Sequence, residues 1–374
     1  MSLEQVLADA DAAATAATAA TRSGRTDPGS THPQAFAGVR ADTTVVEYMK
    51  PFRRYIDQEG INEVCVNEPG ILFAEKSGVW ERFDVPELTY KHCRSLATAC
   101  ATLTGQHTSE TVPLLGAQLP TGERIQFVQP CATAAGIVAV CIRKPSTFLP
   151  RLSDFEKSGL FTRILPGQRA LAPFEEELLS LKEQGRYREF LHKAVLRNRT
   201  IVCAGKTGSG KTTFMKALAE KIPPHERLIT IEDAAELTLP SHQNKLHLFY
   251  SKNAQGASTV SAKQLLEACL RLRPDRIFLA EVRGEEAYYF LRLAASGHPG
   301  SLTSLHAGSC ELAFEQIALM VRESPAGGGM TMPEIKQLAH DVIDIVVHFD
   351  TGADGRHITG IHYDPRARLN RSDA

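Results

Sequence analysis

The feature that most constrains the fold is a glycine-rich stretch at residues 205–212, which reads GKTGSGKT. It matches the complete phosphate-binding loop (P-loop) pattern and follows a short apolar segment at residues 200–204. Its glycines allow backbone N–H groups to turn inward around phosphate oxygens, because no side chain interferes. The helix expected after the loop points its positive end at the same anion. The stretch therefore predicts a nucleoside triphosphate site between a strand and a helix.

The individual P-loop residues have distinct predicted roles. Lys211 can reach the terminal phosphates with its ammonium group, and the Thr212 hydroxyl can ligate Mg²⁺. The rest of the loop and the start of the helix are expected to bind the phosphates of ATP or GTP through Gly205, Lys206, Thr207, Gly208, Ser209, Gly210 and Thr213. The alternative is a glycine-rich turn that carries a lysine by chance, and the complete pattern in this context disfavours it.

Length and composition favour a two-domain enzyme of the reducing cytoplasm. A chain of 374 residues exceeds what one core usually serves. The 42 basic and 43 acidic residues give a net charge of -1, which argues against a dedicated basic nucleic-acid binder. The longest apolar runs are too short to span a membrane, and the N-terminus lacks the apolar segment of a signal peptide. The eight cysteines contain no C-x-x-C pair, so we expect buried thiols and no structural zinc.

The chain divides into four predicted parts. Residues 1–40 are rich in alanine and threonine and are expected to form a flexible extension. Residues 41–144 are predicted to form an α+β domain, with helices at 45–56 and 90–103 and strands at 63–66, 70–75, 79–83, 113–119, 123–128 and 136–143. Residues 145–172 contain several prolines and are predicted to be a linker, and residues 173–374 carry the P-loop.

The C-terminal part shows apolar strands that alternate with helices. Helices are expected at 175–182 and 187–196, and strands at 200–204, 228–232, 245–250, 276–280, 301–306 and 342–349. This alternation is typical of a largely parallel α/β sheet, with the P-loop at the carboxyl end of a strand. The predicted fold class is therefore α/β, with a P-loop domain and a smaller α+β N-terminal domain.

Carboxylates follow two of these strands. Glu232 and Asp233 end the strand at 228–232, where they could hold an attacking water or a metal-bound water. They could equally cap the following turn. The strand at 276–280 is followed by Glu281, which resembles the second signature of P-loop enzymes with glutamate in place of the usual aspartate.

A histidine motif follows at residues 297–307, GHPGSLTSLHA. His306 would stand at the end of a strand beside the P-loop, where it could hydrogen-bond a γ-phosphate and report its loss. Taken alone, an ordinary buried or surface histidine would be the simpler interpretation.

Taken together, these motifs resemble the secretion ATPase superfamily. Four motifs occur in the order typical of that superfamily: the P-loop, the acidic box IED at 231–233, the segment LRPDR at 272–276 leading to EVRG at 281–284, and the histidine motif. The likeness covers residues 40–350 and is closest to the hexameric traffic ATPases of type IV secretion systems. It implies a RecA-like motor domain, a homo-hexameric ring with nucleotide between the two domains, and peripheral attachment to the bacterial inner membrane through secretion-complex proteins. The transported substrate would be DNA or protein.

The resemblance also implies roles for single residues. Lys211 and Thr212 would bind phosphate and Mg²⁺, and His306 would sense the γ-phosphate. Glu232 would be the favoured base or water-positioning group and Glu281 would organise the metal and its waters, although which of the two is the base stays open. Arginines of the N-terminal domain would reach the nucleotide, and the matching positions are Arg124 and Arg143. Without the resemblance, both would be read as surface arginines.

Other functions remain open at this point. An ATPase of a type II secretion or type IV pilus machine shares all four motifs, but its assembly members often carry a paired C-x-x-C zinc insertion that this chain lacks. A P-loop kinase of small molecules would need neither the histidine motif nor the N-terminal arginines, and a regulatory binder without hydrolysis would have no use for two strand-end glutamates. The extended N-terminus and the basic segment at 366–371 match no motif, and a solvated terminus is the simpler interpretation of the latter.

Overall fold

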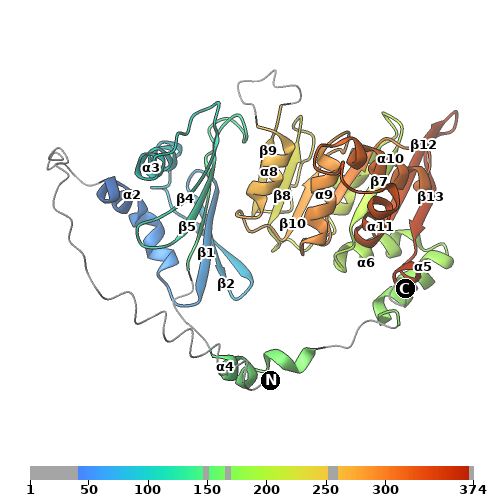
Figure 1. The fold of residues 1–374 in the computed structure, drawn as a ribbon, viewed down its shortest axis with the longest axis horizontal. Coiled ribbons are helices and arrows are strands. Elements are labelled where there is room, and N and C mark those ends of the chain that lie inside the picture. The colour runs from blue at the N-terminus through green and yellow to red at the C-terminus, as the bar shows by residue number, and fades with distance from the viewer. Residues whose placement is uncertain (1–40, 146–150, 165–169, 252–259, 370–374) are drawn as a thin grey trace, which may run out of the picture. The chain divides into compact units, whose positions relative to one another are not determined.

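The computed structural model describes residues 41–145, 151–164, 170–251 and 260–369. The predicted flexible extension at residues 1–40 lies outside these ranges, as do parts of the predicted linker and the end of the basic segment. Within them the chain forms two β-sheets, each with its own helices (Figure 1). None of the described helices combines the length and the apolar character that a membrane span requires.

The first sheet is antiparallel throughout and has six strands in the order β3-β2-β1-β6-β5-β4. Its strands are β1 (Ile61–Glu68), β2 (Ile71–Lys76), β3 (Val79–Asp84), β4 (Leu114–Gln118), β5 (Arg124–Val128) and β6 (Ala139–Arg143). Two helices, α2 (Ala41–Ile56) and α3 (Tyr90–Leu103), cover one face (Figure 1). All the helices and strands predicted in this region are present, with ends shifted by a few residues.

Local sequence explains why α3 begins and how it packs. The Thr89 hydroxyl accepts a hydrogen bond from the backbone N–H of His92 at 3.1 Å, which caps the helix. Small and apolar side chains then recur at helical spacing and pack into the core beneath α2: Cys93, Leu96, Ala97, Cys100 and Ala101. The face of α3 that covers the sheet therefore follows from its sequence pattern.

The second sheet has seven strands in the order β13-β12-β7-β11-β10-β8-β9. They are β7 (Ile201–Gly205), β8 (Leu228–Glu232), β9 (Lys245–Phe249), β10 (Arg276–Leu279), β11 (Leu302–Leu305), β12 (Ile345–Gly352) and β13 (Gly355–Tyr363). All pairings are parallel except the one between β12 and β13, which form an antiparallel hairpin. The predicted largely parallel sheet is confirmed.

Two details at the C-terminal edge differ from the sequence prediction. The strand expected from residue 342 begins at Ile345, because helix α11 (Met332–Val342) runs up to that point. Strand β13 was not predicted at all. It is an edge strand whose side chains are mostly exposed, so it shows none of the burial alternation that identifies a strand in a sequence.

Helices cover both faces of the second sheet (Figure 1). One face is packed by α8 (Ala262–Cys269), α9 (Glu286–Ala295), α10 (Cys310–Glu323) and α11, and the other by α5 (Pro173–Glu183), α6 (Tyr187–Leu196) and α7 (Lys211–Ala219). Three short helices complete the described chain: α4 (Leu152–Lys157), the 3₁₀-helix η1 (Leu160–Arg163) and α12 (Arg366–Leu369). All eight cysteines are free, and all but Cys131 are buried.

Strand β7 shows why the P-loop is held rigidly. Its residues alternate between the two cores, with Val202 and Ala204 on one side and Ile201 and Cys203 on the other. All five residues are buried, as expected of a central parallel strand covered on both faces. Because β8, β10 and β11 run parallel to β7, their carboxyl ends meet the P-loop at the same edge of the sheet.

Candidate nucleotide-binding site

The P-loop connects β7 to α7 through glycines in conformations that other residues rarely adopt. Gly205, Gly208 and Gly210 have φ angles of +148°, +75° and +97°. A Cβ atom at Gly205 would lie well under 3.0 Å from the main-chain oxygen of Phe349 on β12, whereas one at Gly208 would meet nothing within 4 Å. Gly205 is therefore required for packing, and Gly208 keeps the concave side of the loop open for a ligand.

The Lys211 side chain lies inside this loop. It is 7% exposed, and its Nζ donates to the carbonyl oxygens of Gly205 and Lys206 at 2.8 and 2.9 Å. Burial lowers the pKa of Lys211, although the negative charge of Glu281 works in the opposite direction. By contrast, the Lys206 side chain points out of the loop and forms an ion pair with Asp350 at 2.9 Å.

A pocket of about 300 Å³ opens above the loop. Its wall contains P-loop residues together with side chains from several strand ends: Thr207, Gly208, Ser209, Gly210, Lys211, Thr212, Thr213, Glu236, Glu281, Arg283, Ser304, His306 and Arg356. The structure thus places Lys211, Thr212, Glu281 and His306, all singled out from the sequence, around one cavity.

Glu281 and His306 are in direct contact within this pocket. His306 Nε2 lies 2.8 Å from Glu281 Oε1, and His306 Nδ1 lies 3.1 Å from the main-chain oxygen of Gly205. Both ring nitrogens therefore lie close to oxygen atoms of the protein. His306 ties the strand end that carries Glu281 to the first residue of the P-loop.

Arg283 holds the other oxygen of Glu281. It donates to Glu281 Oε2 and pairs with Asp233 at 3.3 Å, so the acidic residue predicted beside Glu232 serves here as an anchor for the arginine. Burial acts to raise the pKa of the Glu281 carboxyl, but the hydrogen bond from Arg283 and the charges of Arg283, His306 and Lys211 outweigh it and lower that pKa. Glu281 is consequently ionised at neutral pH.

Glu232 lies elsewhere. It is 1% exposed and is absent from the pocket wall. Its Oε2 accepts the backbone N–H groups of Glu236 and Leu237, each at 2.8 Å, and its Oε1 accepts from Thr230 at 2.6 Å and contacts His247 at 3.1 Å. In this arrangement its carboxylate fixes the turn after β8 and brings Glu236, rather than itself, to the pocket.

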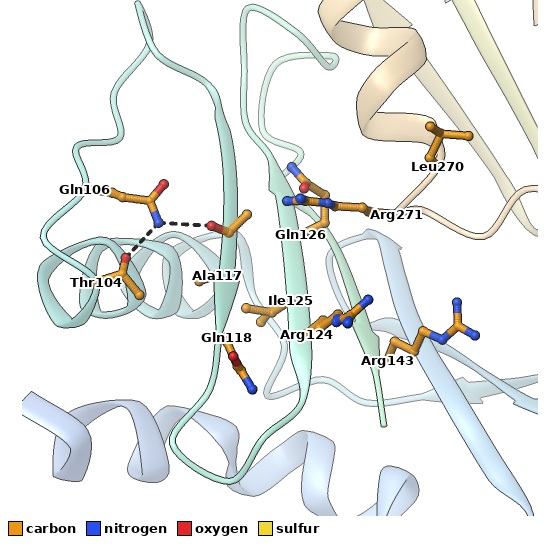
Figure 2. Close-up of a pocket in the computed structure, with 11 residues that line it drawn as sticks. Thr104, Gln106, Ala117, Gln118, Arg124, Ile125, Gln126, Arg143, Leu270 and Arg271 are labelled. Atoms are coloured by element: carbon orange, nitrogen blue, oxygen red, sulfur yellow. Dashed lines mark hydrogen bonds between the residues drawn. The ribbon is translucent and has the colours of Figure 1, made fainter. Parts of the chain in front are cut away.

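The two predicted arginines of the N-terminal domain do not line the P-loop pocket. Arg124 on β5 and Arg143 on β6 line a second pocket, in which Arg271 also takes part (Figure 2). Arg143 lies 3.5 Å from the buried carboxylate of Glu63, while no ion pair is found for Arg124 within the described ranges. The structure therefore does not bring either arginine to the P-loop of its own chain.

The pocket offers oxygen donors that suit Mg²⁺. Thr212 Oγ1 lies 3.3 Å from Glu236 Oε2, and the Glu281 carboxylate shares the same wall. Hydroxyl and carboxylate oxygens are the ligands that Mg²⁺ prefers, usually together with phosphate oxygens and water. In the described part of the chain, no cluster of three or more His, Cys, Asp or Glu side chains could hold a metal by itself. Thr212 and Glu281, both predicted as metal residues, lie in the wall of this one pocket.

Four residues of the pocket wall were not among the predicted site residues: Glu236, Arg283, Ser304 and Arg356. Ser304 lies within the predicted histidine motif at residues 297–307. Glu236 and Arg283 stand close to predicted acids in the sequence, so proximity to those motifs was the available signal. Arg356 belongs to the unpredicted strand β13, and no motif marks it.

Comparison with known proteins places these features in one family. The family model described as "Type II/IV secretion system protein" matches residues 47–346. The chain is 49% identical to the type IV secretion system protein VirB11 of Brucella suis over 337 residues, which cover 89% of this chain and 93% of that protein. It is 40% identical to the PtlH homolog of Bordetella bronchiseptica, with coverage of 80% and 88%.

A solved structure of one of these relatives has the same fold as this chain. The VirB11 ATPase of the Brucella suis type IV secretion system, crystallised with sulphate, aligns with a TM-score of 0.83 at 49% identity and covers 87% of this chain and 99% of that one. The predicted fold class, a RecA-like P-loop domain with a smaller α+β N-terminal domain, is thereby confirmed. The family model and the relatives also confirm the resemblance seen in the motifs, and the chain belongs to the type II/IV secretion system protein family.

Proposed function

We propose that this protein is the hexameric ring ATPase of a type IV secretion system, which couples hydrolysis of Mg²⁺-ATP to pilus assembly and to export of DNA or protein. It would attach peripherally to the cytoplasmic side of the bacterial inner membrane through other secretion proteins. The observation that carries this proposal is the P-loop pocket, which joins Lys211, Thr212, Glu281 and His306 around one cavity.

The enzymatic part of this function has the firmest support. The chain contains the complete P-loop, and the similar Brucella suis protein is a VirB11 ATPase. The protein is an ATP hydrolase of this family. The similar proteins VirB11 and PtlH belong by name to type IV secretion systems, and each resembles the chain along most of its length.

The pocket geometry suggests how hydrolysis proceeds. Lys211 and the backbone N–H groups of the loop neutralise and orient the phosphates. Thr212 would hold Mg²⁺, which when bound would supply positive charge that offsets the charge of the phosphates. The ionised Glu281 is positioned to orient and polarise the attacking water, and His306 lies in contact with its carboxylate. Glu232 would act indirectly, by holding the turn that presents Glu236.

The placement of the arginines supports a ring. Arg124 and Arg143 line a pocket separate from the P-loop pocket of the same chain. If they stabilise phosphoryl charge as the family resemblance implies, they would do so at the P-loop of a neighbouring protomer. Such head-to-tail contacts generate closed rings.

The native mass of the purified protein tests the ring directly. Light scattering in the presence of Mg²⁺ and a non-hydrolysable ATP analogue should give six times the mass of the chain. A monomer under these conditions would contradict the ring and would favour the alternative of a soluble P-loop kinase.

A further inference from the structure

The β12–β13 hairpin extends past the end of β7 and over the P-loop. Strand β12 pairs in parallel with β7 until Phe349 stands beside Gly205, the first loop residue. The hairpin continues for three more residues on β12, and Thr351 pairs with Arg356 on β13. The ion pair between Asp350 and Lys206 fastens this extension to the loop, and the Lys206 ammonium holds the pKa of the Asp350 carboxyl below its ordinary value.

Arg356 projects from this hairpin onto the P-loop. A Cβ atom built on Gly210 would lie 3.4 Å from Cδ of Arg356 and 3.9 Å from its Nη1, and Arg356 is part of the pocket wall. The arginine side chain therefore passes directly beside the loop at Gly210.

The other cations of the pocket already have partners in the protein. Lys211 donates to two loop carbonyls, and Arg283 is paired with Glu281 and Asp233. Arg356 pairs with Thr351 through the backbone, but for its guanidinium no hydrogen bond or ion pair is found with any residue that the structure describes. A guanidinium that borders a phosphate-binding loop and carries no internal partner has its full set of donors available for an anion.

Strand order indicates which part of the nucleotide Arg356 would meet. Glu281 and His306 follow β10 and β11, which lie on one side of β7. In the proposed mechanism, the terminal phosphate lies beside these two side chains. Strand β12 flanks β7 on the other side. The P-loop at the end of β7 lies between these two sides, so a polyphosphate whose terminal phosphate meets Glu281 and His306 would direct its α-phosphate end towards β12 and the hairpin.

We infer that Arg356 is a nucleotide-binding residue supplied by the same chain, and that its guanidinium contacts the α-phosphate end shared by ATP and ADP. This role rests on the proposed ATPase function. A contact present in both nucleotides strengthens binding before and after hydrolysis alike, so it affects affinity and leaves the chemical step largely unchanged.

Calorimetric titration of the full-length protein with ADP and with a non-hydrolysable ATP analogue tests this role. Arg356→Gln should weaken both ligands about 10- to 100-fold and by similar factors, as expected for loss of a charged hydrogen bond. Arg356→Lys should recover part of the loss. His357→Gln is the matched control, because the neighbouring residue on a strand faces the opposite side.

Three outcomes would distinguish a failure of the Arg356 inference from a failure of the ATPase assignment. Thermal melting must first show that each variant is folded. Affinities of Arg356→Gln equal to those of the His357→Gln control would overturn the inference. A loss restricted to the ATP analogue would also overturn it, since it would place Arg356 at the γ-phosphate. If the wild-type protein bound neither nucleotide, the ATPase assignment itself would fail, independently of Arg356.

Discussion

His306 and Glu281 form the contact that organises the nucleotide pocket, with 2.8 Å between Nε2 and Oε1. The contact joins the ends of β10 and β11, and the second ring nitrogen of His306 extends it to the carbonyl of Gly205. Loss of a γ-phosphate near these groups would therefore change the contacts of the P-loop and of both strand ends together. Such a link is what a motor needs to convert nucleotide state into movement.

Replacing Glu281 by Gln should impair the chemical step. The substitution keeps the shape of the side chain but removes the charge that orients water and anchors His306. We expect kcat to fall about 10²- to 10⁴-fold, with the affinity for ATP changed only a few-fold. Steady-state hydrolysis and nucleotide titration measure the two effects. Glu285→Gln, at an exposed position outside the pocket wall, is the control, and an equal kcat in both variants would contradict the role of Glu281.

The two lysines of the P-loop should behave very differently. Lys211 is buried inside the loop, whereas Lys206 points outward to Asp350. Lys211→Ala should reduce ATP hydrolysis by more than about 10³-fold, because the phosphates lose their main counter-charge. Lys206→Ala should stay within a few-fold of the wild type. Normal hydrolysis by the Lys211 variant would remove the basis of the ATPase mechanism.

Glu232 should matter for stability as well as for activity. Four hydrogen-bonding groups surround its carboxylate. Burial acts to raise the pKa of Glu232, but the contacts with His247, Leu237, Thr230 and Glu236 together lower it below its ordinary value. Glu232→Gln should therefore lower the free energy of unfolding by about 1–3 kcal/mol at pH 7, as measured by urea denaturation.

The pH dependence of this difference has a definite sign. A carboxyl whose pKa is lowered in the folded state contributes stability above its unfolded pKa of about 4.3 and loses it as the pH falls through the folded value. The difference in free energy of unfolding between the wild type and Glu232→Gln should thus be constant from pH 7 to pH 5. It should become smaller below about pH 4. A difference in free energy of unfolding that disappears between pH 7 and pH 6, or no difference at all, would show that the hydrogen bonds around the Glu232 carboxylate do not stabilise the fold.

Two glycine substitutions separate packing from ligand binding. Gly205→Ala forces a Cβ atom against the Phe349 carbonyl and should lower the free energy of unfolding by roughly 2–4 kcal/mol. Gly208→Ala meets no atom within 4 Å and should cost only about 1–2 kcal/mol from its positive φ, while still weakening nucleotide binding. Thermal melting should show a lower melting temperature for Gly205→Ala than for Gly208→Ala. Equal melting temperatures would contradict this prediction.

Most of the fold could be predicted because its signals are local. Continuous apolar runs identify buried parallel strands such as β7, and the glycine pattern identifies the loop that follows. The same reasoning placed Lys211, Thr212, Glu281 and His306 at one edge of a sheet, as the structure shows.

The remaining features depend on contacts between distant segments. Nothing in the residues around Glu232 reveals that Leu237 and His247 would enclose its carboxylate. Arg356 lies on an exposed edge strand without a motif, and only the register between β12 and β7 brings it to the loop. The location of Arg124 and Arg143 likewise follows from the packing of the first sheet, which no local pattern specifies.

The most direct test of the ring mechanism is complementation between two inactive variants. A Lys211→Ala protomer retains its arginines, and an Arg124→Ala/Arg143→Ala protomer retains its P-loop. Both should be inactive alone, but when they are co-expressed with different tags and purified as mixed rings, sites between unlike neighbours should work. Random mixing predicts about a quarter of the wild-type ATP hydrolysis. Mixed rings as inactive as either variant alone would contradict the claim that neighbouring protomers complete each nucleotide site.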